Sequence, residues 1–284
     1  MGSPARACLR ILAYLAVTVP LLLVQAMAVV FKLKLARTLP IAYHRQVCRI
    51  IGIRVAVRGQ LAPARPLLIV GNHTSYLDIA VLGSLIPGSF VAKAEIARWP
   101  FFGWLAKLQR SVFIERRPSK VREHKDEIEK RLLDGDVLIL FPEGTSDDGN
   151  RTLPFRSALF GVAERRIEGL PLAVQPVSLA YTRLDGMPMG RSFRPFFAWY
   201  GDMTLPAHLW RMLGMGVLTV EAIFHEPVTI DRFGTRKALS EHCWRVVSEG
   251  VATLLVGRPQ HHPAPHPGAA RERSGLAAPR ALPL

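Results

Sequence analysis

Two four-residue runs of purely apolar residues, at 67–70 and at 137–140, most constrain the fold of this chain. Each run is too short for a buried helix and is followed by a polar, glycine-containing stretch, which is typical of a strand buried on both faces. Strand-like segments alternate with helical ones along the rest of the chain. The expected strands are 54–58, 67–71, 90–92, 111–114, 137–140, 172–179 and 217–224, and the expected helices are 76–85, 119–133, 155–167 and 235–255. This alternation predicts an α/β fold in which helices flank a mixed sheet.

The N-terminal residues predict a helix that anchors the protein in a membrane. The segment 11–31 holds 21 residues and no charged side chain, which is long enough to cross a hydrocarbon core of about 30 Å. Basic residues flank it: Arg6 and Arg10 before it, and Lys32, Lys34 and Arg37 after it. A cleaved signal peptide is the alternative, because Ala-Met-Ala at 26–28 matches the small-residue cleavage pattern. Apolar residues continue past that point, so we expect a retained anchor, either spanning or re-entrant, with the following residues on the cytoplasmic side.

The composition points to an anionic partner. Lys and Arg number 37 against 22 acidic residues, a formal net charge of +15, and such an excess favours either nucleic acid or an anionic membrane face. The basic residues are scattered and carry no signature of a nucleic-acid module. We therefore expect an anionic membrane as partner and no nucleic acid. The widely spaced Cys8, Cys48 and Cys243 suggest neither a metal site nor a disulfide framework.

A histidine and a carboxylate follow the first apolar run, in Asn-His-Thr-Ser-Tyr-Leu-Asp at 72–78. A neutral imidazole that is oriented by a carboxylate can take a proton from an alcohol. In a continuous helix His73 and Asp78 would point about 140° apart, so they converge only if His73 lies in the loop and Asp78 in the first helical turn. Ser75, three residues before the acid, resembles a capping box and supports that placement. By itself the spacing is more often a loop histidine beside a capping acid.

The second apolar run ends in Phe-Pro-Glu-Gly-Thr at 141–145. Sheets of α/β proteins place their ligands at the carboxyl ends of the strands. Gly144 allows a substrate to approach the backbone closely, and Glu143 or Thr145 can hydrogen-bond it; an ordinary turn is the alternative. The chain has no Gly-x-Ser-x-Gly nucleophile elbow, so we expect direct attack by a substrate hydroxyl rather than a covalent enzyme intermediate.

Four blocks together give the chain a family resemblance. They are Asn-His-x4-Asp at 72–78, a Lys…Pro…Gly…Phe-Ile-x-Arg block at 93–116, Phe-Pro-Glu-Gly-Thr at 141–145 and Pro-Val at 176–177. Over roughly residues 55 to 185 the chain resembles the glycerolipid acyltransferases of the lysophosphatidic acid acyltransferase family. Each block is weak alone, but the set is highly specific.

The resemblance implies roles for individual residues. His73 is expected to be the general base on the acceptor hydroxyl, and Asp78 is expected to orient it. The hydroxyl, on a lysolipid, would attack the thioester of acyl-CoA or of acyl carrier protein, with a nearby backbone N–H steadying the oxyanion. No metal or cofactor is required. The residues expected to bind substrate are Lys93, Arg116, Glu143, Gly144, Thr145 and Arg151.

The chain departs from the family pattern after Thr145. Many members continue with an arginine that is expected to hold the acceptor phosphate, whereas this chain continues Ser-Asp-Asp-Gly-Asn at 146–150. Acids there would repel a phosphate, although Arg151 or Arg156 offers a guanidinium from further along. The same stretch resembles the branch that acylates lyso-ornithine lipid, a phosphate-free lipid with a cationic amine that Asp147 or Asp148 would pair with. A solvated turn without substrate contact is the third reading.

We therefore expect a 1-acylglycerol-3-phosphate O-acyltransferase of phospholipid biosynthesis, with lyso-ornithine lipid as the alternative acceptor. An alternative of another class is a non-catalytic protein that binds anionic membranes. Three parts are expected along the chain: an anchor with a basic interfacial segment (1–58), an acyltransferase domain (59–256) and a disordered tail (257–284). The domain is expected to face the cytoplasm at the bacterial inner membrane. Residues 205–215 are expected to form a second membrane contact or a surface loop. The bulky 99–104 stretch has the same two alternatives, and its size also suits the border of an acyl channel.

Overall fold

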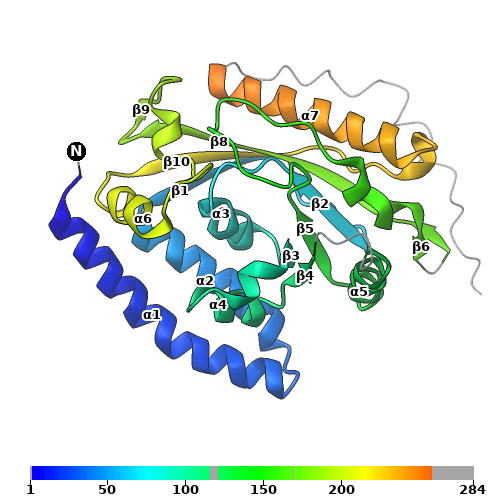
Figure 1. Cartoon of the computed structure of the whole chain (residues 1–284), viewed down its shortest axis with the longest axis horizontal. Coiled ribbons are helices and arrows are strands. Elements are labelled where there is room, and N and C mark those ends of the chain that lie inside the picture. Colours follow the sequence, from blue (N-terminus) through cyan, green and yellow to red (C-terminus); the bar gives the residue numbers. More distant parts are fainter. Residues whose placement is uncertain (1, 116–120, 168, 258–284) are drawn as a thin grey trace, which may run out of the picture.

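A mixed sheet of eight strands forms the centre of the part of the chain that the computed structural model describes, which is residues 2–115, 121–167 and 169–257. The strands of the sheet are β1 (Ile53–Arg58), β2 (Leu67–Gly71), β3 (Gly88–Lys93), β4 (Val112–Ile114), β5 (Val137–Leu140), β8 (Ala173–Leu184), β9 (Met187–Pro188) and β10 (Leu218–Phe224). Their order is β1-β10-β8-β2-β5-β3-β4, and β9 pairs with β8 (Figure 1). Along this order only β10 and β8 are antiparallel. The predicted α/β fold with a mixed sheet is confirmed.

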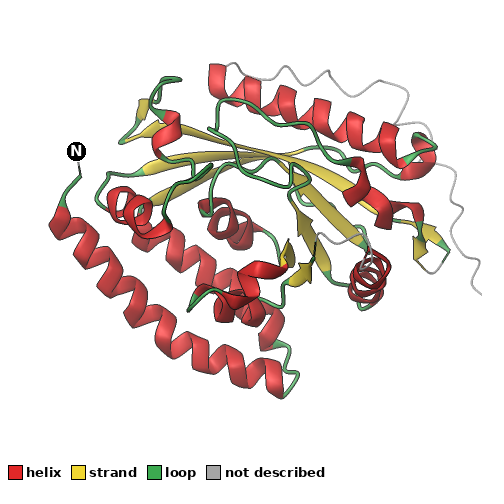
Figure 2. Ribbon diagram, viewed as in Figure 1, coloured by secondary structure: helices red, strands yellow, loops and turns green. Residues whose placement is uncertain are grey.

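Helices cover both faces of this sheet (Figure 2). The α-helices are α1 (Pro4–Val30), α2 (Leu35–Ile51), α3 (Leu77–Leu85), α4 (Phe102–Leu108), α5 (Val121–Leu133), α6 (Leu205–Leu213) and α7 (Arg236–Val256). The 3₁₀ helices are η1 (Ala94–Arg98), η3 (Ser157–Glu164), η4 (Arg194–Phe196) and η5 (Ile230–Arg232), and β6 (Arg166–Ile167) pairs with β7 (Leu170–Pro171) outside the sheet. One face packs against α2 and α3, and the other packs against α7 and η3.

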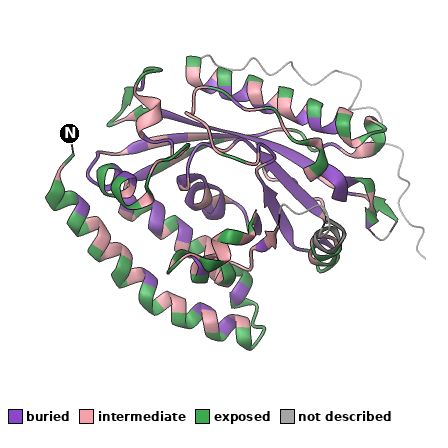
Figure 3. Ribbon diagram, in the orientation of Figure 1, coloured by how far each residue is buried: buried purple, intermediate pink, exposed green. Residues whose placement is uncertain are grey.

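Burial of the central strands explains why they read as continuous apolar runs. In β2, Leu67 and Ile69 belong to the core on the α2–α3 side, whereas Leu68 and Val70 belong to the core on the α7 side. All four side chains are at most 1% exposed. Figure 3 shows the same burial along the middle of the sheet. Because no face of these strands meets water, alternation of apolar and polar residues is absent.

One expectation about an individual element needs correction. The predicted α-helix at 155–167 is the 3₁₀ helix η3 followed by the short strand β6; Gly161 lies inside it and disfavours an α-helix. The strand expected at 54–58 is β1, which pairs in parallel with β10. Residues 258–284, expected to form a disordered tail, and Arg116 lie outside the described residues.

The N-terminal helix α1 lies along α2, α4 and α6 instead of standing apart from the rest of the molecule (Figure 1). Near its start, the Arg10 guanidinium donates hydrogen bonds to the carbonyls of Leu213, Met215 and Gly216, at 3.0, 2.8 and 3.2 Å. Near its end, the Gln25 amide donates to the carbonyl of Leu108, at 2.9 Å. These contacts fix one face of α1 at both ends.

The opposite face of α1 is apolar and exposed. Its exposed large side chains are Leu9, Leu12, Leu15, Val19, Leu23, Val24, Met27 and Val30. By length and composition, α1 is the helix among the described residues that is able to cross a membrane. A contiguous exposed apolar face of this size is typical of a surface that contacts a membrane or another protein.

Replacement of Arg10 by Ala should loosen α1 from the domain. Three charge-assisted hydrogen bonds to carbonyls disappear, and one such bond contributes about 1.5–3 kcal/mol. We expect at least tenfold faster hydrogen exchange of the α1 amides in detergent micelles, measured by mass spectrometry. Arg6→Ala, one turn earlier on the same helix, is the matched control and should leave exchange unchanged. Equal protection in both variants would contradict the docking role of Arg10.

Candidate active site

The site begins where β2 ends, and the Asn72 side chain fixes that point. The register places Gly71 opposite Val177 of β8. The Asn72 amide then donates to the Leu179 carbonyl at 2.9 Å and accepts from the Leu179 N–H at 2.8 Å. The buried Asn72 side chain thus pairs with the Leu179 backbone in place of a further residue of β2. The backbone of Asn72 is therefore free to turn toward α3. The loop that carries His73 is anchored to the sheet by this pair of bonds.

His73 and Asp78 meet as the spacing predicts, one in the loop and one in the first turn of α3. Nδ1 of His73 and Oδ2 of Asp78 lie 2.8 Å apart. The same Oδ2 accepts from the backbone N–H groups of Thr74 and Ser75, at 2.7 and 3.0 Å, and Oδ1 accepts from the Tyr181 hydroxyl at 2.6 Å. Asp78 is fully buried, whereas the His73 side chain is 22% exposed. Because Asp78 accepts from every partner, Nδ1 of His73 carries the hydrogen, and its Nε2 keeps a lone pair.

Only half of the expected capping box is present. Asp78 reaches back to the Ser75 N–H, as the acid of such a box does. The Ser75 hydroxyl forms no cap, and α3 begins at Leu77 after Tyr76. The carboxylate therefore serves the histidine and the loop backbone together, which ties the conformation of the loop to the orientation of the imidazole.

Glu143 occupies a different position from the one expected of a substrate ligand. It is 3% exposed, and its two oxygens accept from the N–H groups of His73 and Leu153, at 3.0 and 3.2 Å. Burial raises the pKa of Glu143 to about 8, and the nearby charges of Asp78 and Asp147 add to the shift. Its carboxyl group holds the backbone of the His73 loop and does not line the cavity described below.

The residues on either side of Glu143 do face the histidine. The Phe141 ring stacks on the His73 imidazole, with centroids 4.3 Å apart and planes at 14°. Gly144 and Thr145 line the cavity at His73, and Gly144 has a φ of 71°, a left-handed conformation that favours glycine. The Gly144 N–H already donates to the Phe141 carbonyl at 3.1 Å.

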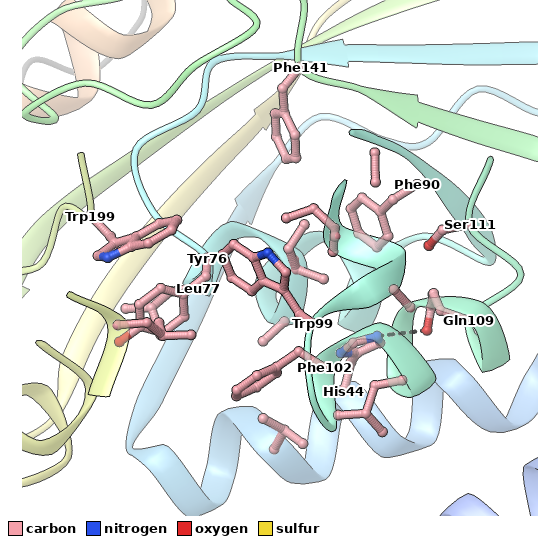
Figure 4. Close-up of a pocket in the computed structure, with 18 of the residues that line it drawn as sticks. His44, Tyr76, Leu77, Phe90, Trp99, Phe102, Gln109, Ser111, Phe141 and Trp199 are labelled. Atoms are coloured by element: carbon pink, nitrogen blue, oxygen red, sulfur yellow. Dashed lines mark hydrogen bonds between the residues drawn. The ribbon is translucent and has the colours of Figure 1, made fainter. Parts of the chain in front are cut away.

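A cavity of about 900 Å³ extends from His73 to the inner face of α1. Its wall is largely apolar and is built from α1, α2, α3, η1, α4 and α6 and from the ends of β3 and β5. Examples are Leu15, Leu22, Val47, Phe90, Ile96, Leu105, Phe141 and Leu209. Figure 4 shows Phe141 at the top of the cavity and His44, on α2, near the bottom. Trp99 and Tyr76 lie between these two side chains. A cavity with this lining fits a hydrocarbon chain whose reactive end lies at the histidine.

The other predicted residues divide into two groups. Lys93, at the end of β3, lines the cavity, as do Trp99 and Phe102 of the bulky stretch and Leu205 and Leu209 of α6. Residues 205–213 are thus a helix beside the cavity, with Trp210 exposed. Arg151 does not line the cavity. Its side chain is 73% exposed and pairs with Asp147, Nε to Oδ2 at 2.8 Å.

The stretch 146–150 is partly exposed and is tied to the His73 loop and to the 191–199 segment. The Asp147 N–H donates to the His73 carbonyl at 3.2 Å, and the Ser146 hydroxyl donates to the Trp199 carbonyl at 2.5 Å. The Asn150 amide donates to Asp148 and to the Arg191 carbonyl, at 3.0 and 3.1 Å. The departure from the family pattern therefore lies directly beside the histidine.

Sequence reasoning missed Tyr181 and the structural role of Asn72. Tyr181 lies in the twelve-residue strand β8, of which only the first part was expected. Nothing in its neighbourhood in the sequence distinguishes it from a core aromatic residue. The register between β2 and β8 brings it under Asp78, and that register is a property of the sheet and not of the local sequence.

Known proteins resemble this chain over most of its length. A model of the family described as Acyltransferase matches residues 53–180. Several relatives are named lyso-ornithine lipid O-acyltransferase; the one from Brucella abortus is 46% identical over 226 residues, which cover 78% of this chain and 85% of that protein. The 1-acyl-sn-glycerol-3-phosphate acyltransferase of Neisseria gonorrhoeae is 32% identical over 206 residues, 70% of this chain and 76% of that protein.

A solved structure has the same fold. The 1-acyl-sn-glycerophosphate acyltransferase PlsC from Thermotoga maritima superposes with a TM-score of 0.56, covering 80% of this chain and 81% of that chain. The two sequences are 22% identical. This likeness concerns the arrangement of the sheet and its helices.

The raised pKa of Glu143 predicts a pH-dependent cost to folding. Between about pH 4.5, where the unfolded residue titrates, and about pH 8, the native state keeps a proton that the unfolded state loses. The free energy of unfolding therefore falls as pH rises through this window, by up to about 1.4 kcal/mol per pH unit. Glu143→Gln removes that slope. We expect the melting temperature of this variant, relative to wild type, to increase from pH 5 to pH 8 in a thermal-shift assay.

Glu164→Gln is the control for that experiment, since Glu164 is 43% exposed. Its melting curve should track wild type across the same pH range. A Glu143→Gln curve that runs parallel to wild type would contradict the shifted titration.

Proposed function

The chain belongs to the acyltransferase family, and on that premise we propose that it transfers a fatty acyl group from an acyl thioester to the free hydroxyl of a lyso-ornithine lipid. The single observation that carries the chemistry is the His73–Asp78 pair, 2.8 Å apart, at the end of a large apolar cavity. The acceptor rests on the similarity to the lyso-ornithine enzymes and on the residues beside His73.

In the proposed reaction, Nε2 of His73 takes the proton of the acceptor hydroxyl as its oxygen attacks the thioester carbonyl. The tetrahedral intermediate collapses, the C–S bond breaks, and the imidazolium returns the proton to the leaving thiolate. Asp78 stabilises the imidazolium, and the hydrogen bonds from Thr74, Ser75 and Tyr181 keep its carboxylate fixed. Neither a metal nor a covalent enzyme intermediate is needed.

The polar residues beside His73 favour a cationic head group over a phosphate. Asp147 is 16% exposed and pairs with Arg151, the guanidinium that a phosphate would need. Because Arg151 is largely exposed, water screens this ion pair and it is weak, so the amine of an ornithine head group can displace Arg151. The carboxylate of the same head group has two cations nearby, because Lys93 and Arg156 both line the cavity.

Lysophosphatidic acid is the second candidate acceptor. The sequence motifs alone put it slightly ahead, and the relative from Neisseria gonorrhoeae supports it at 32% identity. The Brucella abortus enzyme matches at 46% over a larger share of the chain. We therefore reverse the order and place lyso-ornithine lipid first. The acyl donor is either acyl-CoA or acyl carrier protein.

We infer that α1 anchors the enzyme in one leaflet, on the cytoplasmic face of a bacterial inner membrane. Both ends of α1 contact the same domain, through Arg10 and through Gln25. If α1 crossed the bilayer, its two ends would lie at opposite membrane faces, about 30 Å apart. One of the two contacts with the domain would then be lost. The exposed apolar face of α1 in the acyl layer, with Lys32 and Lys34 at the headgroups, satisfies both constraints.

Replacement of His73 by Ala should lower turnover by about 10²- to 10⁴-fold, the usual contribution of a positioned general base. The assay follows transfer of a radiolabelled acyl group from the thioester to lysolipid in membranes from cells that express the protein. Arg183→Ala, an exposed residue of β8, serves as the control. Turnover near wild type in His73→Ala would contradict the assignment of His73 as the general base.

An acceptor competition tests the substrate. Wild-type membranes receive labelled acyl thioester with equal amounts of lyso-ornithine lipid and lysophosphatidic acid, and we expect the ornithine product to dominate. Asp147→Asn should lower the ratio of ornithine to phosphatidic acid product by about tenfold or more, because a charge-assisted bond to the amine is lost and Arg151 is released. Arg151→Ala should leave the ratio unchanged or raise it.

Asp148→Asn is the matched variant for Asp147→Asn. The Asp148 carboxylate is held by the Asn150 backbone and side chain, at 2.9 and 3.0 Å, so its loss should affect both acceptors alike. Exclusive transfer to lysophosphatidic acid in wild type, abolished by Arg151→Ala, would replace the first candidate with the second.

A further inference from the structure

Arg110 occupies a position at the end of α4 where glycine is the usual residue. The Arg110 N–H donates to the Lys107 carbonyl at 2.9 Å, and the Ser111 N–H donates to the Ala106 carbonyl at 3.1 Å. These two bonds form a Schellman motif, in which the residue at the place of Arg110 is left-handed and is most often glycine. Arg110 has a φ of 61°. A side chain that is kept in a backbone conformation unfavourable to it indicates a role for that side chain.

The Arg110 side chain belongs to a cluster of three arginines around one carboxylate. Asp136, just before β5, is buried, and its Oδ2 accepts from the guanidiniums of Arg110 and Arg131, at 2.7 and 2.6 Å. Nε of Arg37, in the first turn of α2, lies 3.7 Å from the other carboxylate oxygen. We call these four residues the Asp136 cluster. Its three positive charges face one negative charge, so the cluster has an excess of positive charge.

The Arg131 guanidinium is fully engaged within the protein. Besides Asp136, it binds the Arg110 carbonyl and the Ser89 hydroxyl, at 2.8 and 2.9 Å. Each of its three nitrogens thus donates to a different partner. Arg131 therefore pairs with Asp136 whether or not the Arg110 side chain is present.

The other two arginines of the cluster are more accessible. Arg37 is exposed and Arg110 is partly exposed. Among the described residues, the Arg110 side chain donates only to Asp136, and the Arg37 side chain donates only to the Asp134 carbonyl, at 3.4 Å. A guanidinium has five N–H donors, so both can bind another group. Burial lowers the pKa of Arg110, and the charges of Arg131 and Arg37 lower it further against the effect of Asp136. An anion beside Arg37 and Arg110 would offset this repulsion.

The cluster lies where α1, α2 and α4 meet. The Gln25 amide, near the end of α1, donates to the carbonyls of Ala36 at the start of α2 and of Leu108 at the end of α4, at 3.0 and 2.9 Å. Ala36 precedes Arg37, and Leu108 lies two residues before Arg110. The turn from α1 into α2, at the bottom of Figure 1, adds exposed apolar side chains to those of α1: Phe31, Leu33 and Leu35. Arg37 therefore lies within one helical turn of side chains that would enter lipid.

We propose that Arg37 and Arg110 bind the phosphate group of an anionic phospholipid at the membrane surface. The inference rests on the proposed placement of α1 in one leaflet, but not on the reaction. A guanidinium binds phosphate oxygens through two parallel N–H donors. Because Arg37 and Arg110 both contact Asp136, their guanidiniums are close enough to bind the same phosphate.

A phospholipid with a net negative charge fits this site better than a zwitterionic one. In a zwitterionic headgroup the phosphate charge is balanced by the amine of the same molecule, whereas the excess charge of the cluster requires an anion without a counterion. The lipid would also connect two walls of the cavity, since Arg37 lies on α2 and Arg110 follows α4, and both helices line it.

Native mass spectrometry of the full chain in a non-ionic detergent tests the proposal, with phosphatidylglycerol or phosphatidylcholine added at matched concentrations. We expect wild type to bind phosphatidylglycerol about tenfold more tightly than phosphatidylcholine. Arg110→Gly should weaken phosphatidylglycerol binding about tenfold, which is the range for one lost charge-assisted interaction, and should not change phosphatidylcholine binding. Equal affinity of wild type for the two lipids, or a preference that Arg110→Gly retains, would overturn the proposal.

Arg110→Gly should fold well, because glycine favours the left-handed conformation and Arg131 still pairs with Asp136. Its melting temperature without lipid checks this. Arg37→Gln leaves the end of α4 unchanged and should also weaken the preference for phosphatidylglycerol.

Arg49→Gln is the matched control. It removes the same charge from another exposed position on α2, where Arg49 donates to Gln46, and it should retain the preference. An equal loss in Arg49→Gln would mean that the general charge of the surface selects the lipid, and it would overturn the specific site.

Two further measurements identify the source of the phosphate and separate this site from the reaction. Inorganic phosphate at the concentration of the lipid should not displace phosphatidylglycerol; displacement would overturn the lipid and assign the site to a free phosphate. Acyl transfer to lysolipid is measured on the same preparations. Binding of phosphatidylglycerol that depends on Arg110, in a protein without acyl transfer, would support the lipid site and refute the reaction. Acyl transfer with equal binding of both lipids would do the opposite.

Discussion

The buried carboxylate of Asp78 is the interaction on which the site depends. It has no contact with water and accepts hydrogen bonds from an imidazole, two backbone N–H groups and a tyrosine hydroxyl. A charge in this position is tolerated only because all four partners are in place. Three of the partners come from the loop before α3 and one from β8, distant in the chain, so the fold has to be complete before the histidine is oriented.

A second buried carboxyl group, that of Glu143, also binds the His73 loop. Glu143 binds the N–H of His73 itself, while Asp78 binds the ring of the same residue and the two N–H groups after it. The two motifs that were apparent in the sequence, at 72–78 and 141–145, thus form one site. One motif supplies the reactive group, and the other holds its backbone against the sheet. The acidic stretch after Thr145 belongs to the same site, because the Asp147 N–H donates a hydrogen bond to the His73 carbonyl.

Most of the fold was predictable because its strands are buried on both faces. The runs at 67–70 and 137–140 leave no alternative to central strands, and the loop-then-helix placement of His73 and Asp78 follows from the geometry of a helical turn. The position of the Glu143 side chain was not predictable, because a sequence shows that an acid follows a strand but not which way its side chain turns. The contact of Tyr181 with Asp78 was not predictable either, because it depends on strand register.

The helix α1 has two functions that are usually separate. Its outer face is the surface expected to meet lipid, while its inner face supplies Tyr14, Leu22 and Gln25 to the wall of the cavity. The proposed membrane attachment and the wall of the cavity are therefore made from opposite faces of one helix. A shortened protein that begins after residue 31 would lose the α1 wall, and its cavity would be open along one side. Under the proposed function, water would then reach the space where the thioester has to survive until the lysolipid attacks it.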